Sequence, residues 1–267
     1  MSRIEKKFKT LANQSRKALV TFVTAGDPQP EATLPLMHLL VENGADIIEL
    51  GVPFSDPMAE GPVIQAACER ALRYHINLPQ IFDIVRQFRE TDQETPVILM
   101  GYLNPLEVMG YAEFAREAAA AGVDGVLTVD LPPEEAVGFC QTMEAAEIDP
   151  IFLIAPTSNA GRIATICNAS RGFVYYVSVK GVTGSSKLDV ASVEKKISEI
   201  RKFSSIPVGV GFGIKDAQSA AAVAQVADAV VVGSAIVNLI GSNANDETGM
   251  QQQVATLVSS LRVAMDE

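Results

Sequence analysis

Short apolar runs alternate along this chain with longer segments in which apolar residues recur at helical spacing. Eight such runs, rich in β-branched residues and bounded by Gly, Asp or Pro, predict strands that begin near Ala18, Asp46, Pro96, Val123, Asp149, Gly172, Ile206 and Ala227. Most of them are apolar throughout instead of alternating, which is typical of a parallel sheet buried on both faces. The alternation of strand and helix patterns predicts repeated βα units.

Eight βα units, with no linker or change of composition between them, predict a single (β/α)8 TIM barrel over residues 1–267 and not two doubly wound domains. Extra helices are expected at the N-terminus, after the second strand in LPQIFDIVRQFRET, and after the eighth strand in GMQQQVATLVSSLRVAMDE. The sixth strand is followed by the polar, glycine-rich segment GVTGSSKLD. Long loops in compact domains are often functional, and this one is expected to be a lid at the end of the barrel where chemistry occurs.

The composition agrees with a large globular core and excludes several classes of protein. Of the 267 residues, 48% are hydrophobic and 20% are charged, which is too apolar for a disordered chain. The formal net charge of -11 predicts no binding of nucleic acid or of an anionic membrane surface. No uncharged apolar run approaches the roughly 18 residues of a membrane span.

The cysteines and histidines predict a cytoplasmic protein without a metal. Cys68, Cys140 and Cys167 are odd in number and form no CxxC pair, and the charged start MSRIEKKFKTLANQ does not fit a signal peptide. A reducing compartment is therefore expected. His38 and His75 are the only histidines and lie far from any cysteine in the sequence, so no zinc site is expected.

A single carboxylate interrupts the second predicted strand, in the segment ELGVPFSDPMAEGP. Glu49 lies within an otherwise apolar run, and Asp56 and Glu60 follow in a loop rich in Pro and Gly. One interpretation is a structural carboxylate held by a salt bridge inside the barrel. The favoured interpretation is a general acid/base whose pKa is raised by burial, because catalytic groups gather where barrel strands end.

Three glycine-containing turns are candidates for binding an anion. The runs GFG (211–213) and GSA (233–235) each end a predicted strand and precede an apolar helix, so their backbone N–H groups can approach a phosphate. Barrels often bind phosphate in the loops after strands seven and eight. Either run alone also fits an ordinary tight turn, but the pair favours a phosphate site, to which GVTG (181–184) could contribute.

Other polar residues at strand ends have both structural and functional interpretations. Asp27 and Asp130 fit helix caps or loop anchors, and Tyr175 fits core packing. Lys180 would form a Schiff base with a carbonyl substrate if the protein were a covalent aldolase. Polar and glycine residues follow Lys180 and nothing in the sequence desolvates it, so a solvated loop cation is favoured.

Several motifs together resemble one known family. TFVTAGDP, ELGVPFSDPMAEGPVIQ, GYLNP, VDGVLTVDLP, YYVSVKGVTG, GVGFGI and VGSAIV occur in this order and are similar to the signatures of the tryptophan synthase alpha chain. The resemblance implies a (β/α)8 barrel that cleaves indole-3-glycerol phosphate to indole and glyceraldehyde 3-phosphate. It also implies no cofactor in this chain and a partner, the beta subunit of an α2β2 complex, which uses pyridoxal phosphate and receives indole through a tunnel.

The resemblance assigns roles to residues by their place in these motifs. Glu49 matches the acid/base glutamate of the family, and Glu60 stands where the family usually has an aspartate, because the family's ADGP reads AEGP here. The substrate-binding positions are Phe22, Leu99 or Met100, Leu127 and Tyr175 around the indole, and Thr183, Gly184, Phe212, Gly213, Gly233 and Ser234 toward the phosphate. The loops expected to act as lids and to communicate with the beta subunit contain Pro53, Asp56, Pro57 and Thr183.

The chemistry of this reaction explains why two carboxylates are wanted. The bond from indole C3 to the glycerol side chain breaks once C3 is protonated, and a base must then take the proton of the adjacent hydroxyl. One carboxyl of raised pKa, Glu49, can serve both steps, while Glu60 meets the positive charge that develops at the indole N–H. In an alternative, the change at Glu60 weakens catalysis and the chain acts mainly as a binding partner and activator of the beta subunit.

Overall fold

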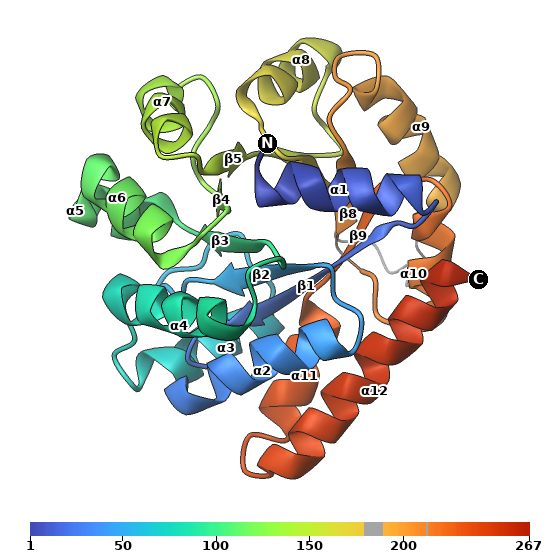
Figure 1. Cartoon of the computed structure of the whole chain (residues 1–267). Coiled ribbons are helices and arrows are strands. Elements are labelled where there is room, and N and C mark those ends of the chain that lie inside the picture. Colours follow the sequence, from blue (N-terminus) through green and yellow to red (C-terminus); the bar gives the residue numbers. More distant parts are fainter. Residues whose placement is uncertain (179–188, 212) are drawn as a thin grey trace.

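The strands form one parallel sheet that curves into a barrel (Figure 1). The computed structural model describes residues 1–178, 189–211 and 213–267. Neighbouring strands follow the order β5-β4-β3-β2-β1-β9-β8-β7-β6, and each hydrogen-bonded pair is parallel. The strands are β1 (Ala18–Thr24), β2 (Ile47–Gly51), β3 (Val97–Gly101), β4 (Gly125–Thr128), β5 (Asp149–Ile151), β6 (Leu153–Ile154), β7 (Val174–Val177), β8 (Val208–Gly211) and β9 (Ala229–Val232).

The chain itself joins the two edges of this sheet. β5 pairs with β4 and β6 pairs with β7. Only Phe152 separates these two short segments, and its carbonyl oxygen accepts a hydrogen bond from the backbone N–H of Tyr175 at 3.2 Å. β5 and β6 are therefore the two halves of the fifth barrel strand, and the predicted (β/α)8 barrel is confirmed.

Helices surround the barrel, and most follow the sequence pattern (Figure 1). In the described ranges they are α1 (Arg3–Asn13), α2 (Pro30–Glu42), α3 (Pro62–Leu72), α4 (Leu78–Thr91), α5 (Leu103–Met109), α6 (Tyr111–Ala121), α7 (Val137–Ala145), α8 (Ala160–Ala169), α9 (Val190–Ile200), α10 (Ala217–Ala224), α11 (Ser234–Ser242) and α12 (Glu247–Asp266). The expected extra helices are present as α1, as α4 after the second strand, and as α12 after the eighth barrel strand. None of the helices described is both long and apolar enough to cross a membrane.

The sequence pattern does not predict α5, which follows the third strand. This helix has 7 residues, too few for a helical period to be recognised, and it contains Pro105. Its start is fixed by Asp130, whose Oδ1 accepts a hydrogen bond from the backbone N–H of Leu103 at 2.8 Å. Its end is fixed by Gly110 at a φ of 85°, a conformation that favours glycine. Asp130 is thus a loop anchor, one of the two roles predicted for it.

A helix covers the end of the barrel where the strands begin. α1 lies across this end (Figure 1), and its Ile4, Phe8 and Leu11 pack against apolar side chains of the barrel interior. The rings of Phe8 and Phe173 have their centroids 5.8 Å apart. Because apolar side chains fill this end, a binding site is expected at the other end, where the strands finish.

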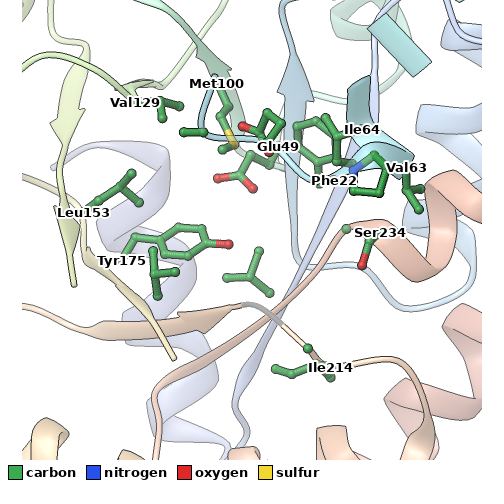
Figure 2. Close-up of a pocket in the computed structure, with 18 residues that line it drawn as sticks. Phe22, Glu49, Val63, Ile64, Met100, Val129, Leu153, Tyr175, Ile214 and Ser234 are labelled. Atoms are coloured by element: carbon green, nitrogen blue, oxygen red, sulfur yellow. The ribbon is translucent and has the colours of Figure 1, made fainter. Parts of the chain in front are cut away.

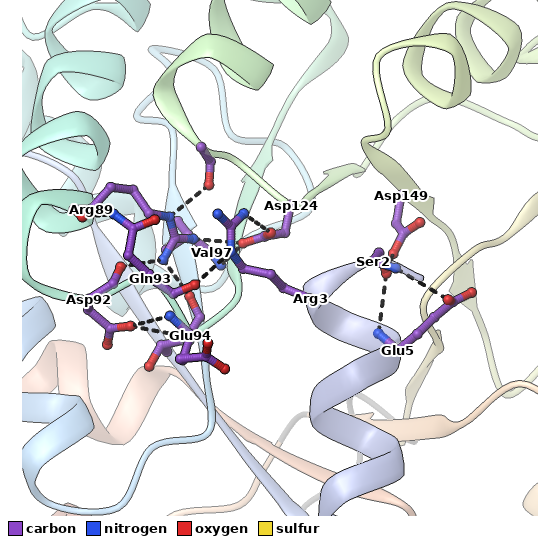
Figure 3. Close-up of polar contacts among 12 residues, drawn as sticks. Ser2, Arg3, Glu5, Arg89, Asp92, Gln93, Glu94, Val97, Asp124 and Asp149 are labelled. Carbon is purple, nitrogen blue, oxygen red and sulfur yellow. Dashed lines mark hydrogen bonds and ion pairs between the residues drawn. The ribbon is translucent and has the colours of Figure 1, made fainter.

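A buried ion-pair network holds α1 and α4 at the same end of the barrel (Figure 3). The guanidinium of Arg89 donates to Asp124 Oδ2 at 2.7 Å and to three backbone carbonyl oxygens. The other oxygen of Asp124 accepts a hydrogen bond from Arg3 at 2.8 Å, and Asp124 Oδ2 also accepts one from the backbone N–H of Val97 at 2.8 Å. Asp124 therefore connects two strands and two helices through one side chain.

Replacing Arg89 by methionine should lower the free energy of unfolding by about 3 to 5 kcal/mol, because it leaves a buried carboxylate and buried carbonyl groups without a partner. Arg116→Met is the matched control: this guanidinium is 61% exposed and pairs with Glu113 and Glu117 at the surface. Its loss should cost at most about 1 kcal/mol. Urea unfolding of both variants measures the difference, and equal losses would contradict the importance of the buried network.

Candidate active site

A cavity of about 410 Å³ lies where the barrel strands end (Figure 2). Its walls are mostly apolar, and two carboxyl side chains, Glu49 and Glu60, are part of them. The residues that line it are Phe22, Glu49, Ala59, Glu60, Gly61, Pro62, Val63, Ile64, Met100, Val129, Leu153, Tyr175, Val177, Gly213, Ile214, Val231, Gly233 and Ser234. The loops after the second, seventh and eighth barrel strands thus meet around one space.

Glu49 is the central residue of β2 and enters the cavity from the barrel wall. It lies opposite Phe22 of β1 and Ile98 of β3 in the sheet register. The residue is 1% exposed, and its Oε1 is buried without a hydrogen-bond partner among the residues described. None of the ion pairs within the described ranges includes Glu49. Among the described residues, Glu49 therefore has no cationic partner for the structural salt bridge.

Burial decides the protonation state of Glu49. It raises the pKa of this carboxyl from 4.5 to about 8, and the nearby Glu60 carboxylate contributes to the rise. The physical cause is the loss of hydration, which disfavours the charged form when no cation or donor replaces the water. At neutral pH Glu49 therefore carries a proton that it can donate to a molecule in the cavity.

Glu60 reaches the same cavity from the loop between β2 and α3. The side-chain amide of Gln65 donates to the carbonyl oxygen of Glu60 at 2.9 Å. The backbone N–H of Ala59 donates to the hydroxyl oxygen of Tyr102 at 2.9 Å, which ties the loop to the end of β3. Glu60 is partly buried, and this burial raises its pKa. The backbone around Glu60 is thus fixed from two sides.

Two strand glycines make room for the aromatic walls. A Cβ atom on Gly51 would overlap the ring of Phe22, and one on Gly211 would overlap the phenol of Tyr175. The Tyr175 hydroxyl points into the cavity, on the side that faces the carboxyl group of Glu49 (Figure 2). Burial raises the pKa of Tyr175, and Glu49 adds to the effect. Tyr175 therefore lines the site in addition to packing in the barrel interior.

The turns after β8 and β9 form another part of the wall. Gly213 has a φ of +81°, and a Cβ atom there would meet nothing within 4 Å. Gly233 is the N-cap of α11, and Ser234 is the first residue of that helix. Backbone N–H groups at a helix N-terminus attract anions. The three residues therefore lie together beside the cavity, where an anionic group of a ligand can meet these N–H groups.

Not every residue expected at the site lines the cavity. Leu127 is fully buried in the barrel interior, and Val129, two residues further along, lines the cavity instead. Leu99 packs in the outer core between strands and helices, whereas Met100 faces the cavity. Ile64, Val129 and Leu153 are lining residues that sequence reasoning did not identify. The two-residue alternation of a strand puts Val129 on the same face as Leu127 but does not say which of the two reaches the cavity.

Of the loop positions expected to act as lids or partner contacts, the three that the structure describes, Pro53, Asp56 and Pro57, do not line this cavity. Pro53 is buried, and Asp56 is exposed and accepts a hydrogen bond from Ser55 Oγ at 2.6 Å. Asp56 and Pro57 line a separate surface hollow beside α3. Lys180, Thr183, Gly184 and Phe212 lie outside the described residues.

Asp27 is a structural anchor and not part of the cavity wall. Its carboxylate is buried and accepts two hydrogen bonds from the guanidinium of Arg70, at 2.6 and 2.9 Å. The pair ties the loop after β1 to α3, the helix that begins directly after the Glu60 loop. The predicted role of Asp27 as a loop anchor is thereby confirmed.

The chemistry available in this cavity is that of carboxyl groups. No group of three or more His, Cys, Asp or Glu that could hold a metal ion occurs in residues 1–178, 189–211 and 213–267. Cys68, Cys140 and Cys167 are free thiols. Aromatic and aliphatic walls, a protonated carboxyl, a second carboxyl and an anion-attracting turn suit an apolar ring that carries an anionic tail.

Comparison with known proteins gives a consistent result over the whole chain. The family profile described as "Tryptophan synthase alpha chain" matches residues 8–266. A protein of that name from Thioalkalivibrio sulfidiphilus is 60% identical over 266 residues, covering 100% of both chains. Tryptophan synthase subunit alpha from Legionella pneumophila has a similar structure, with a TM-score of 0.92, 46% identity, and coverage of 100% of this chain and 99% of that one. A chain of Mycobacterium tuberculosis tryptophan synthase has a TM-score of 0.89 and 36% identity, covering 99% and 98% of the two chains.

Proposed function

Because this chain belongs to the tryptophan synthase alpha chain family, we propose that the cavity around Glu49 is where it cleaves indole-3-glycerol phosphate to indole and glyceraldehyde 3-phosphate. The activity is that of a carbon-carbon lyase in tryptophan biosynthesis. One observation carries the assignment of the site: Glu49 is a buried, unpaired carboxyl group in a mostly apolar cavity that also contains Glu60.

Glu49 supplies and then recovers a proton. Its raised pKa keeps it protonated at neutral pH, so that it can transfer a proton to C3 of the indole ring. Protonation makes the ring an electron sink, and the carboxylate that results can take the proton of the adjacent side-chain hydroxyl as the carbon-carbon bond breaks. The aldehyde and indole are then released, and Glu49 is again protonated.

Glu60 stabilises the ring cation that forms between these steps. Protonation at C3 places positive charge on the indole nitrogen, and a fixed carboxylate beside the N–H group lowers the energy of that state. The hydrogen bonds of Gln65 and Ala59 fix the backbone from which Glu60 reaches the cavity. The Tyr175 and Phe22 rings offer flat surfaces for the indole.

The turn at Gly213 and the α11 N-terminus hold the phosphate in this proposal. Replacing Gly213 by valine should weaken binding of glycerol 3-phosphate by at least about tenfold, because a branched side chain crowds the backbone N–H groups and is strained at positive φ. Binding of indole should change by less than about twofold. Isothermal titration calorimetry with each ligand measures both effects.

Gly110→Val is the matched control for this measurement. Gly110 has a φ of +85°, and a Cβ atom there also meets nothing within 4 Å, but it lies between α5 and α6, away from the cavity. The control also places a branched residue at a positive φ, but it does not touch the anion-attracting turn. Equal losses for both ligands, or an equal loss of glycerol 3-phosphate binding in the control, would argue against the phosphate site.

Membership of the alpha chain family implies a beta-subunit partner. We further propose an α2β2 assembly in which the partner holds pyridoxal phosphate and this chain holds no cofactor. Asp56 and Pro57, on the surface hollow next to the Glu60 loop, are the proposed link between partner and active site. They lie four and three residues before Glu60, so a partner that contacts them would act on the same loop.

Release of indole from indole-3-glycerol phosphate tests the proposed function. The chain should form indole alone and form it faster with a matching beta subunit. A barrel that only activates its partner would stimulate the beta reaction while releasing no indole itself. The presence of both carboxyl groups in one cavity favours the lyase over this alternative.

A further inference from the structure

A second cavity, much smaller than the first, adjoins the active site behind Glu60. Its volume is about 20 Å³, which is room for one water molecule. It shares Phe22, Glu60, Ile64 and Met100 with the main cavity. This small cavity is lined by Phe22, Thr24, Gly51, Val52, Glu60, Ile64, Cys68, Met100, Gly101 and Tyr102.

Thr24, which lines the small cavity, has a buried hydroxyl group that forms no hydrogen bond with the described residues. Thr24 is the last residue of β1 and is 2% exposed. Its Oγ1 has no hydrogen-bond partner among the residues described. Thr24 lies opposite Gly51 of β2, and both residues line the small cavity. Buried hydroxyl groups in folded proteins are normally hydrogen-bonded, either to protein atoms or to ordered water.

Other polar groups line the same small cavity. Glu60, Cys68 and Tyr102 line it, and their side chains carry a carboxyl group, a thiol and a hydroxyl group. Tyr102 already accepts a hydrogen bond from Ala59, which leaves its own proton free to donate. Burial raises the pKa of the Cys68 thiol, which therefore stays protonated. A buried water needs two to four polar partners, and the small cavity supplies that number.

We propose that the small cavity holds one water molecule that hydrogen-bonds to the Thr24 hydroxyl and donates to the Glu60 carboxylate, which makes Thr24 a positioning residue for Glu60. This inference rests on the catalytic role proposed for Glu60. A glutamate has one more rotatable bond than an aspartate, so a hydrogen bond from the cavity wall restricts a side chain that would otherwise sample more rotamers. The same hydrogen bond favours the charged form of Glu60 and opposes the effect of its burial.

Thr24→Val tests the proposal, because valine has nearly the shape of threonine but no hydroxyl group. The rate of indole release should fall by about tenfold, which corresponds to the loss of one hydrogen bond to a charged group. The acid limb of the rate profile should also move to higher pH. Glu60 must be ionised to act, and losing a hydrogen bond to its carboxylate raises its pKa. Thr24→Ser keeps the hydroxyl and should restore both the rate and the acid limb.

Thr21→Val is the matched control in the same strand. The Thr21 hydroxyl is also buried and has no hydrogen-bond partner among the described residues, but Thr21 lines neither of the two cavities. Its replacement should change neither the rate nor the acid limb. A purely structural role for buried threonines in β1 would instead make the two valine variants behave alike, and that result would overturn the proposal.

Two further measurements separate this inference from the proposed function. In a Glu60→Ala background, Thr24→Val should cause no further loss of rate, because Thr24 acts through Glu60; additive losses would overturn the positioning role. A crystal structure of the parent protein should show one ordered water between Thr24 and Glu60, and the Thr24→Val structure should lack it. A parent small cavity without this water overturns the inference even if indole is released normally. A parent that releases no indole overturns the proposed function instead and leaves the crystallographic result to stand by itself.

Discussion

Replacing Glu49 by glutamine should lower the rate of indole release at least about a hundredfold, the usual scale for loss of a general acid/base. Glutamine has the same size, but its amide cannot give a proton to indole C3 or take one from the side-chain hydroxyl. The barrel should remain folded, because the buried Glu49 carboxyl is already neutral at neutral pH and the exchange introduces no buried charge. The loss should therefore appear in the rate and not in the yield of folded protein.

The measurement compares parent and variant with the beta subunit present, on protein shown to be free of parent contamination. Circular dichroism and urea unfolding serve as the control for folding. The parent rate should also fall as the pH rises through about 8, because Glu49 then loses the proton on which the first step depends. A glutamine variant that retains the rate within a few-fold would remove Glu49 from the mechanism.

Glu60→Ala should cost about a hundredfold or more in turnover, the scale for losing one preorganised electrostatic partner. The physical reason is that positive charge then develops at the indole nitrogen in a mostly apolar cavity without a carboxylate to meet it. The backbone hydrogen bonds of the loop do not involve the Glu60 side chain and should survive. Steady-state rates with the beta subunit present measure the effect.

Glu60→Asp is the variant to compare with Glu60→Ala, because it keeps the carboxylate and shortens the side chain by one methylene. The aspartate should change turnover by less than about tenfold, because loops absorb a difference of one methylene at a cost below about 1.36 kcal/mol. An alanine variant as active as the parent would show that Glu60 has no catalytic role and would favour the activator alternative. A large gain in the aspartate variant would mark Glu60 as an impaired catalytic residue.

The barrel could be predicted because its signals are local and repeated. A buried parallel strand is apolar throughout, and the helix after it carries its own period, so each unit is visible without its neighbours. The missed helix α5 shows the limit of this signal. Its start depends on Asp130, which lies 27 residues later in the chain. The sequence of the helix segment therefore contains no signal for this start.

The site was predictable to the extent that single residues stand out. Glu49 is conspicuous because it is a charged residue in an apolar strand, and Gly213 and Gly233 because they end strands before helices. Leu127 and Val129 are both apolar and two residues apart, so the sequence does not say which of them reaches the cavity. The Asp27–Arg70 pair joins residues 43 positions apart, and no local pattern reveals it.

The contacts of α1 also set an order of events during synthesis. Its partners are made much later: Ser2 Oγ donates to Asp149, 147 residues further along the chain, and Arg3 pairs with Asp124, 121 residues further along. While the ribosome makes the first four βα units, the apolar face formed by Ile4, Phe8 and Leu11 has no completed surface on which to dock. The segment translated first therefore completes the floor of the barrel late, and until then its apolar side chains are exposed to solvent and to chaperones.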